Sequence, residues 1–153
     1  MRALIVGGGR PGLEVARRLA DEGNAVRYVT RNEAFRPEIE AAGAECFIGD
    51  PDRIGTLRYA LDNVTVLLWL MGAVDGGELH GTRLSMMIER TIDTTVRGVV
   101  YEGTEQGAEV VRRMAAFNEI PYAIVDVGRD DVEEWTAKVL SAVGEVLAKP
   151  RGR

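Results

Sequence analysis

The sequence contains one cysteine and one histidine among its 153 residues. Because Cys46 has no second cysteine to pair with, it cannot form an internal disulfide. One histidine and one cysteine also provide no cluster of metal ligands, so we expect no metal site. The motif G-x-S-x-G does not occur, and Leu13 follows Gly12 where a P-loop would carry lysine. The sequence therefore gives no indication of a metalloenzyme, a serine hydrolase or a P-loop nucleotidase.

Long apolar runs are also missing from this sequence. None approaches the ~20 residues that a membrane-spanning helix needs, and the apolar residues 3–6 form too short a run for a signal peptide. The net charge of −5 is unfavourable for a nucleic-acid partner. We therefore expect a cytoplasmic protein that binds neither membrane nor nucleic acid.

Short apolar segments alternate with amphipathic segments along the whole chain. The apolar segments predict strands over residues 3–6, 25–30, 45–48, 64–71, 98–101 and 122–127. Helices are expected between them, including one marked by Ile54, Leu57 and Leu61, one over 78–92, and a last one opened by a capping box at Asp130 and Glu133. Parallel strands need crossover helices, which are nearly always right-handed. We predict an α/β fold with an open, doubly wound parallel sheet of about six strands, Rossmann-type and three-layered. Residues 1–150 would form one domain, with no separate substrate domain.

A glycine-rich turn follows the first predicted strand. Gly7, Gly9 and Gly12 fit G-x-G-x-x-G, which is a weak signal alone but a strong one between a strand and an amphipathic helix. Gly7 would permit the tight turn, Gly9 would let a pyrophosphate approach the backbone, and Gly12 would let the helix pack closely on the strand. Pro11 suits the first helical turn, where its missing N–H is not needed. The alternative is a purely structural turn, and we favour dinucleotide binding.

The residues after the second predicted strand bear on the choice of cofactor. An acid usually lies ~20 residues beyond the glycines and binds the ribose of NAD, but Thr30, Arg31 and Asn32 stand there instead. Arg31 could pair with the 2′-phosphate of NADP, and Arg10 in the glycine turn could approach the same group. We therefore predict NADP as the cofactor, with NAD as the alternative. Arg31 could instead be a solvated loop arginine.

The segment GDPDRIGTLRYALDNVTVLLWLMG resembles the GD–D–L–AL–V–V segment of atypical short-chain dehydrogenase/reductase proteins, the NmrA-like NAD(P)-binding Rossmann family. The resemblance implies that Asp50, followed by Pro51, lies by the adenine of the cofactor. It also implies that Leu70, Met71 and Gly72 pass near the adenine ribose. A turn or cap role for Asp50 is equally open. The nucleotide domains of potassium-transport regulators share a similar segment, but they normally carry the acid that this chain lacks.

The chain departs from this family where the family carries its catalytic pair. Active members use a Tyr-x-x-x-Lys pair, in which lysine lowers the pKa of the tyrosine. The four tyrosines here are followed four positions later by Asn32, Asn63, Glu105 and Asp126. Only about one helix follows the sixth predicted strand, so the resemblance does not extend to the family's substrate region.

Three residues remain as weak catalytic candidates. Tyr101 and Thr104 follow the fifth predicted strand, and His80, near Glu78, follows the fourth. We expect no lysine or histidine beside Tyr101, which would leave its pKa near ~10. A surface position at a helix start is the favoured interpretation of His80.

Two functional hypotheses follow. The first is a nucleotide- or redox-sensing or regulatory module that binds a dinucleotide without turnover, and the missing catalytic pair favours it. The second is a small NADPH-dependent oxidoreductase with non-standard acid and base residues. A homodimer is also considered, because Trp135 and the last predicted helix could present an apolar face.

Overall fold

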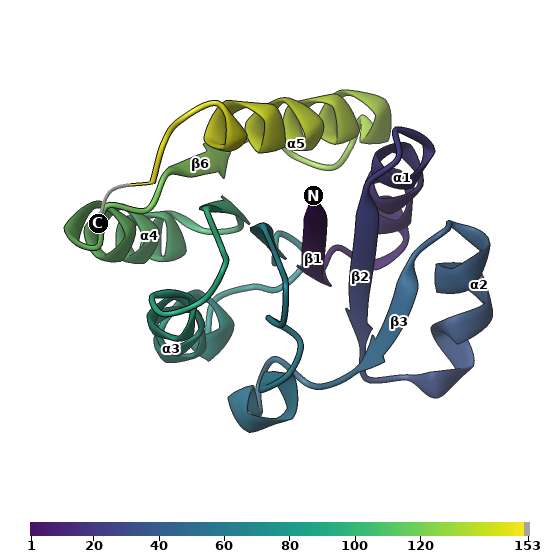
Figure 1. Cartoon of the computed structure of the whole chain (residues 1–153), viewed down its shortest axis with the longest axis horizontal. Coiled ribbons are helices and arrows are strands. Elements are labelled where there is room, and N and C mark those ends of the chain that lie inside the picture. The colour runs from purple at the N-terminus through teal and green to yellow at the C-terminus, as the bar shows by residue number, and fades with distance from the viewer. Residues whose placement is uncertain (152–153) are drawn as a thin grey trace.

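A computed structural model describes residues 1–151 and shows one six-stranded parallel sheet (Figure 1). The strand order is β3-β2-β1-β4-β5-β6, which reverses direction between β1 and β4. This order places a crevice at the carboxyl ends of those two strands. The strands are β1 (Arg2–Gly7), β2 (Ala25–Thr30), β3 (Glu45–Ile48), β4 (Val66–Leu70), β5 (Gly98–Glu102) and β6 (Tyr122–Val125). The predicted α/β fold, with an open doubly wound sheet, is confirmed.

Helices cover both faces of the sheet. Figure 1 shows α1 (Gly9–Asp21) and α5 (Val132–Leu147) on one face, and α3 (Thr82–Thr91) and α4 (Glu105–Phe117) on the other. The short α2 (Arg36–Ala41) packs on β3 at one edge. Single turns of 3-10 helix form η1 (Glu33–Phe35), η2 (Ile54–Leu57) and η3 (Glu78–His80).

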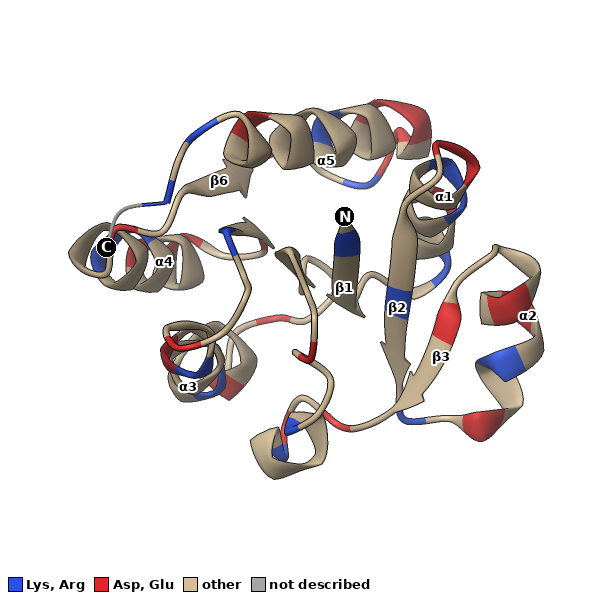
Figure 2. Cartoon of the chain, in the orientation of Figure 1, with Lys and Arg blue, Asp and Glu red and all other residues tan. Residues whose placement is uncertain are grey.

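The central strands contribute side chains to two separate hydrophobic cores, one on each face of the sheet. In β4, Leu67 and Trp69 pack with α3 and α4, whereas Val66 and Leu68 pack with α1 and α5. Side chains of a strand alternate between its two faces, so a strand covered on both faces needs apolar residues throughout, as β4 has. Charged residues lie mainly on the helices and loops (Figure 2). The few charged residues of the strands include Glu102, the last residue of β5.

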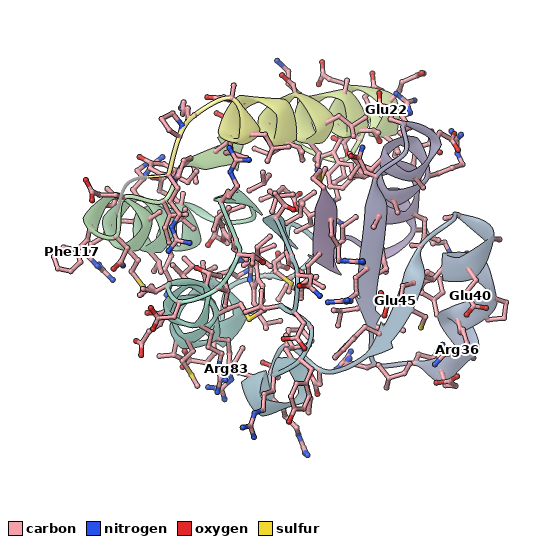
Figure 3. The ribbon with its side chains drawn as sticks, viewed as in Figure 1. Glu22, Arg36, Glu40, Glu45, Arg83 and Phe117 are labelled. Atoms are coloured by element: carbon pink, nitrogen blue, oxygen red, sulfur yellow. The ribbon has the colours of Figure 1, made fainter. Side chains whose placement is uncertain are left out.

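The outer faces of the helices are polar, with isolated apolar exceptions. Figure 3 labels several of the outward-facing residues, among them Arg36 and Glu40 on α2 and Phe117 at the end of α4. The Phe117 side chain is exposed. A single exposed apolar residue is normal for a folded protein and marks no site by itself.

Three local predictions are wrong. The helix predicted through Ile54, Leu57 and Leu61 is only the turn η2, because the Thr56 hydroxyl donates to the Asp50 and Arg53 carbonyls and folds the segment back. The helix predicted over 78–92 is divided at Gly81 into η3 and α3. The last helix is capped one residue later than predicted, by Asp131, whose side chain accepts from the Glu134 amide at 3.1 Å.

The apolar face of α5, which we expected to be exposed to a second copy of the chain, is buried against the sheet. Trp135 is fully buried, and its indole N–H donates to the Glu102 carboxylate at 3.1 Å. Val139, Val143 and Val146 of the same helix are also buried against the sheet. The argument from Trp135 is therefore wrong, and a homodimer stays a prediction without that support.

Candidate functional site

The turn between β1 and α1 has a backbone that glycine alone can adopt readily. Gly7, Gly8 and Gly9 have φ values of 82°, 85° and 56°, in the left-handed region. The Gly8 amide donates to the Leu70 carbonyl at 2.7 Å, which ties the turn to the end of β4. A Cβ at Gly7 would lie 2.2 Å from that same oxygen. The glycine loop, residues 7–12, therefore requires glycine at its first position for space as well as for φ.

The Tyr28 side chain contacts the glycine loop at Gly9 and Gly12. This residue of β2 is buried, and its hydroxyl donates to the Gly9 carbonyl. A Cβ at Gly12 would lie 2.5 Å from the Tyr28 hydroxyl oxygen. Gly12 thus allows the first helix to approach the neighbouring strand closely. Burial raises the pKa of Tyr28 well above its usual value, while the charge of Arg129 lowers that pKa in part, so the hydroxyl remains a donor at neutral pH.

The first turn of α1 presents unpaired N–H groups. The Gly12 amide donates to the Gly8 carbonyl at 3.0 Å, and this is the first hydrogen bond within the helix. The amides of Gly9 and Arg10 precede it and have no acceptor within the helix, and Pro11 has no N–H. No acidic residue lies in this first turn. Such a helix terminus favours an anion through its amides and its dipole.

A cavity of about 470 Å³ opens beside the glycine loop, over the carboxyl ends of β1, β2 and β3. It is lined by predicted site residues from four separate segments, which are Gly7 and Gly9, Thr30 and Arg31, Asp50 and Pro51, and Met71. The structure therefore brings together the glycine loop, the end of β2 and the segment after β3. A larger cavity of about 670 Å³ lies near the start of β6, but none of the glycine-loop residues lines it.

The remaining predicted site residues lie outside this cavity. Arg10 pairs with Glu38 and stands over the ring of Phe35, which lines the cavity. Asn32 caps η1 by accepting from the Ala34 amide at 3.0 Å. Leu70 is buried and contributes its carbonyl. Gly72 lies against the Glu102 carboxylate, to which its amide donates at 2.8 Å.

Arg31 and Asp50 differ in how far their side chains are already engaged. Arg31 is exposed at the mouth of the cavity and makes no hydrogen bond or ion pair with any of residues 1–151. Asp50 accepts from the Asp52 amide at 2.9 Å through one carboxylate oxygen. This is the turn role that we considered for Asp50. The second oxygen remains able to accept from a ligand.

A second cavity of about 520 Å³ lies over the carboxyl ends of β5 and β6. Gly72 and Ala73 from the end of β4 line it on one side, and Thr104 and Arg129 are among its other lining residues. The two cavities therefore lie on opposite sides of the position where the strand order reverses. This is where an extended ligand binds in an open α/β sheet.

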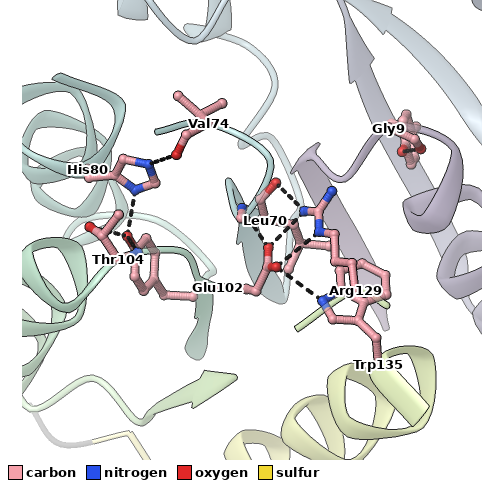
Figure 4. A network of polar contacts seen from close by, with 11 residues as sticks. Gly9, Leu70, Val74, His80, Glu102, Thr104, Arg129 and Trp135 are labelled. Atoms are coloured by element: carbon pink, nitrogen blue, oxygen red, sulfur yellow. Dashed lines mark hydrogen bonds and ion pairs between the residues drawn. The ribbon is translucent and has the colours of Figure 1, made fainter. Parts of the chain in front are cut away.

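His80 and Tyr101 form a buried hydrogen-bonded pair (Figure 4). His80 Nδ1 lies 2.7 Å from the Tyr101 hydroxyl, and His80 Nε2 lies 2.7 Å from the Val74 carbonyl. Because that carbonyl can only accept, Nε2 carries the hydrogen and Nδ1 of the neutral ring accepts from tyrosine. The Thr104 amide donates to the same hydroxyl at 2.9 Å.

Two sequence predictions are corrected by this pair. His80 is fully buried and does not lie on the surface, and Tyr101 does have a histidine beside it. Burial raises the pKa of Tyr101, although its hydrogen bonds with Thr104 lower it in part. Glu78 does not join the pair in an acid/base arrangement, because it accepts from the Thr82 hydroxyl at 2.5 Å at the start of α3. Thr104 instead caps α4, accepting from the Gly107 amide at 3.1 Å.

A buried ion pair that sequence reasoning missed is drawn in Figure 4, and both of its residues line the second cavity. The Glu102 carboxylate, only 4% exposed, pairs with Arg129 from the loop between β6 and α5 at 2.8 Å. The guanidinium stacks on the Trp135 ring at 4.8 Å from its centre. The sequence contains one indication of this pair, which is a charged residue, Glu102, at the end of an apolar strand. It contains no indication that Arg129 is the partner.

The part of the chain that the structure describes shows no group of three or more His, Cys, Asp and Glu residues that could hold a metal ion. Across residues 1–151, every helix is too short or too polar to span a bilayer.

Comparisons with known proteins agree with this architecture. The family model of the TrkA-N domain, an NAD(P)-binding Rossmann domain, matches residues 3–73. No protein of curated function matches the sequence significantly. The match to TrkA-N covers β1 through the end of β4, and so includes the glycine loop and the segment after β3.

Solved structures of low sequence identity share the fold. An NADPH-dependent quinone oxidoreductase of Escherichia coli complexed with NADPH has 21% identity and a TM-score of 0.66, covering 84% of this chain and 49% of its own. A Citrobacter sp. triphenylmethane reductase complexed with NADP(H) has 19% identity and a TM-score of 0.62, covering 81% and 48%. A short-chain dehydrogenase/reductase superfamily protein of Agrobacterium tumefaciens with bound NAD has 15% identity and a TM-score of 0.63, again covering 81% and 48%. This chain thus spans about half the length of each.

We predict that Gly12→Ala destabilises the glycine loop through its contact with Tyr28. The added Cβ would meet the Tyr28 hydroxyl at 2.5 Å, and overpacking of this kind costs about 1–3 kcal/mol of unfolding free energy. Urea unfolding measures the loss. Adding Tyr28→Phe to Gly12→Ala should recover part of it, because the clashing oxygen is removed.

The matched control is Gly144→Ala in α5, where an added Cβ would meet nothing within 4 Å. Alanine there should leave the stability unchanged or raise it by about 0.5–1 kcal/mol. Equal effects of the two alanine substitutions would show that the contact between Gly12 and Tyr28 is not tight.

Proposed function

We propose that this chain binds NADP(H) and acts as a redox- or nucleotide-sensing or regulatory module. The observation that supports this most is the unpaired Arg31 at the mouth of the cavity beside the glycine loop. A guanidinium there suits the 2′-phosphate that distinguishes NADP from NAD, since arginine binds phosphate through two parallel hydrogen bonds. The acidic residue that usually follows this strand in NAD-binding Rossmann domains, and that would repel the 2′-phosphate, is replaced here by Thr30, Arg31 and Asn32. Residues 1–150 would act as one cofactor-binding domain.

The shape of the crevice supports a dinucleotide. The adenosine half would occupy the first cavity near Asp50, and the pyrophosphate would accept from the Gly9 and Arg10 amides. The other half would extend over the ends of β4 and β5 toward the second cavity. The nicotinamide of such a cofactor accepts or donates a hydride. Gly7 and Gly12, where a Cβ would collide with neighbouring atoms, keep the loop close to the sheet.

A binding role without turnover is supported by the state of the catalytic candidates. His80 and Tyr101 are fully buried, and their polar atoms are already hydrogen-bonded to each other, to the Val74 carbonyl and to the Thr104 amide. A tyrosine that serves as an acid in hydride transfer needs a lowered pKa and contact with the substrate, whereas burial raises the pKa of Tyr101. The sequence also lacks the Tyr-x-x-x-Lys pair of the resembling reductases.

A second candidate function is NADPH-dependent reduction of a small substrate. The cavity over β5 and β6 favours it, because Tyr101 and Thr104 are both among its lining residues. Two of the similar structures are an NADPH-dependent quinone oxidoreductase and a triphenylmethane reductase bound to NADP(H). In this alternative Thr104 or Tyr101 would supply the proton.

The cofactor preference can be tested with Arg31→Met. We expect NADPH to bind the unaltered protein more tightly than NADH, and the substitution to weaken NADPH binding about 10-fold, the loss of one charge-assisted contact. NADH binding should change less than about threefold on the same basis. Fluorescence titration of both reduced cofactors measures the two affinities.

The control for this test is Arg113→Met on α4, which lines neither of the two cavities. It should leave both affinities unchanged. Tighter binding of NADH than of NADPH by the unaltered protein would contradict the assignment of Arg31.

The two candidate functions are separated by NADPH oxidation. We expect no sustained turnover with quinones, flavins or carbonyl compounds, because burial raises the pKa of Tyr101 and no Tyr-x-x-x-Lys lysine is present to lower it. Absorbance at the NADPH band measures the rate. Robust turnover that is abolished by Tyr101→Phe or His80→Ala would favour the oxidoreductase instead.

A further inference from the structure

We propose that Arg129 is the second cation of the phosphate site, binding the pyrophosphate from the side of β4 opposite the first turn of α1. The inference rests on the proposed function, because it concerns the same ligand. No sequence pattern predicts that a residue from the loop between β6 and α5 lies beside the glycine loop, which comes more than a hundred residues earlier in the chain.

The position of Arg129 is fixed by a carbonyl that it shares with the glycine loop. Arg129 Nη2 donates to the Leu70 carbonyl at 3.2 Å, and the Gly8 amide donates to the same oxygen at 2.7 Å. The guanidinium and the loop are therefore immediate neighbours at the end of β4. Figure 4 shows Arg129 between the Glu102 carboxylate and the part of the loop that carries Gly9.

One edge of the guanidinium is left without a partner. Arginine has five N–H donors. The Nε hydrogen and one Nη2 hydrogen bond to Glu102, at 3.0 and 2.8 Å, and the other Nη2 hydrogen is directed to Leu70. Nη1 has no acceptor among residues 1–151, and the side chain is 18% exposed. Two donors on a positively charged group thus remain available beside the loop.

Glu102 holds Arg129 without competing for the ligand. Its two carboxylate oxygens accept from the Gly72 amide, from two nitrogens of Arg129 and from the Trp135 indole. These four bonds match the capacity of a carboxylate, so its charge is well compensated. With the Trp135 ring stacked beneath it, the guanidinium is held in one orientation before a ligand arrives, and little entropy is lost on binding.

Arg129 is better placed for the pyrophosphate than the arginine of the loop itself. The Arg10 side chain is 73% exposed and is already paired with Glu38. The charge of Arg129, in contrast, reaches the Tyr28 hydroxyl beneath the loop and lowers the pKa of that group in part. Arg31 follows β2 and lines the first cavity, whereas Arg129 lines the second. The two arginines would therefore recognise different phosphates of the same cofactor.

The separate roles of Arg31 and Arg129 can be tested with two fragments of the cofactor, each of which carries one kind of phosphate. ADP contains the diphosphate but no 2′-phosphate, and adenosine 2′-monophosphate contains only the 2′-phosphate. The test variant is Glu102→Gln/Arg129→Met, which removes both charges together, because a lone buried Glu102 carboxylate would destabilise the fold. Isothermal titration gives the affinity of each fragment, and thermal unfolding verifies that the variant is folded.

We expect the double variant to bind ADP about 10-fold or more weakly, the effect of losing a charge-assisted contact, and adenosine 2′-monophosphate within about threefold of the unaltered protein. Arg31→Met should do the reverse. The dependence of ADP affinity on salt should also become shallower in the double variant, as it does when a cation–phosphate contact is lost. If Arg129 had only a structural role, the double variant would lose affinity for both fragments to the same extent.

Unchanged ADP affinity in the double variant would overturn the role of Arg129 while leaving the proposed function intact. Equal loss of both fragments would also overturn it, because the ion pair would then only support the fold. If neither ADP nor NADPH bound the unaltered protein, the proposed function itself would fail, and the inference with it.

Discussion

The hydrogen bond from the Gly8 amide to the Leu70 carbonyl is the contact on which the rest of the site depends. It ties the turn after β1 to the end of β4, at the position where the strand order reverses. The bond requires a backbone in the left-handed region and leaves no room for a side chain at Gly7. Once it is made, the first turn of α1 has its free amides directed over the carboxyl edge of the sheet.

Groups from distant parts of the chain then gather around that bond. Tyr28 supports the loop from β2, and Arg129 reaches the same Leu70 carbonyl from the loop before α5. The Glu102–Arg129 pair links β5 to α5 through Trp135. Removing one member of such a buried pair costs more than removing both, since the remaining charge is left without a partner. The same contacts therefore hold the sheet to α5 and line the second cavity.

Most of the fold could be predicted from the sequence because its signals are local. The six strands follow from short apolar runs, and the glycine loop from the G-x-G-x-x-G spacing between a strand and an amphipathic helix. The turn η2 was mistaken for a helix because the apolar spacing of Ile54 and Leu57 is the same in both, and the backbone is redirected by Thr56.

The candidate site was predictable only in part. Arg31, after β2, could be placed from its spacing beyond the glycines, and Asp50, after β3, from the family resemblance. Tyr28 could be predicted as buried, but not as a donor to Gly9, because that depends on how closely α1 approaches β2. Arg129 and His80 were missed as partners of Glu102 and Tyr101, since each pair joins loops whose paths no local pattern determines.

The central claim is that the amides at the start of α1 bind the phosphates of a dinucleotide. A crystal structure of the protein with NADPH tests this most directly. The account predicts the pyrophosphate against the Gly9 and Arg10 amides, with the adenosine over the ends of β2 and β3. Phosphates bound elsewhere, or a glycine loop closed by its own side chains in the presence of the cofactor, would contradict it.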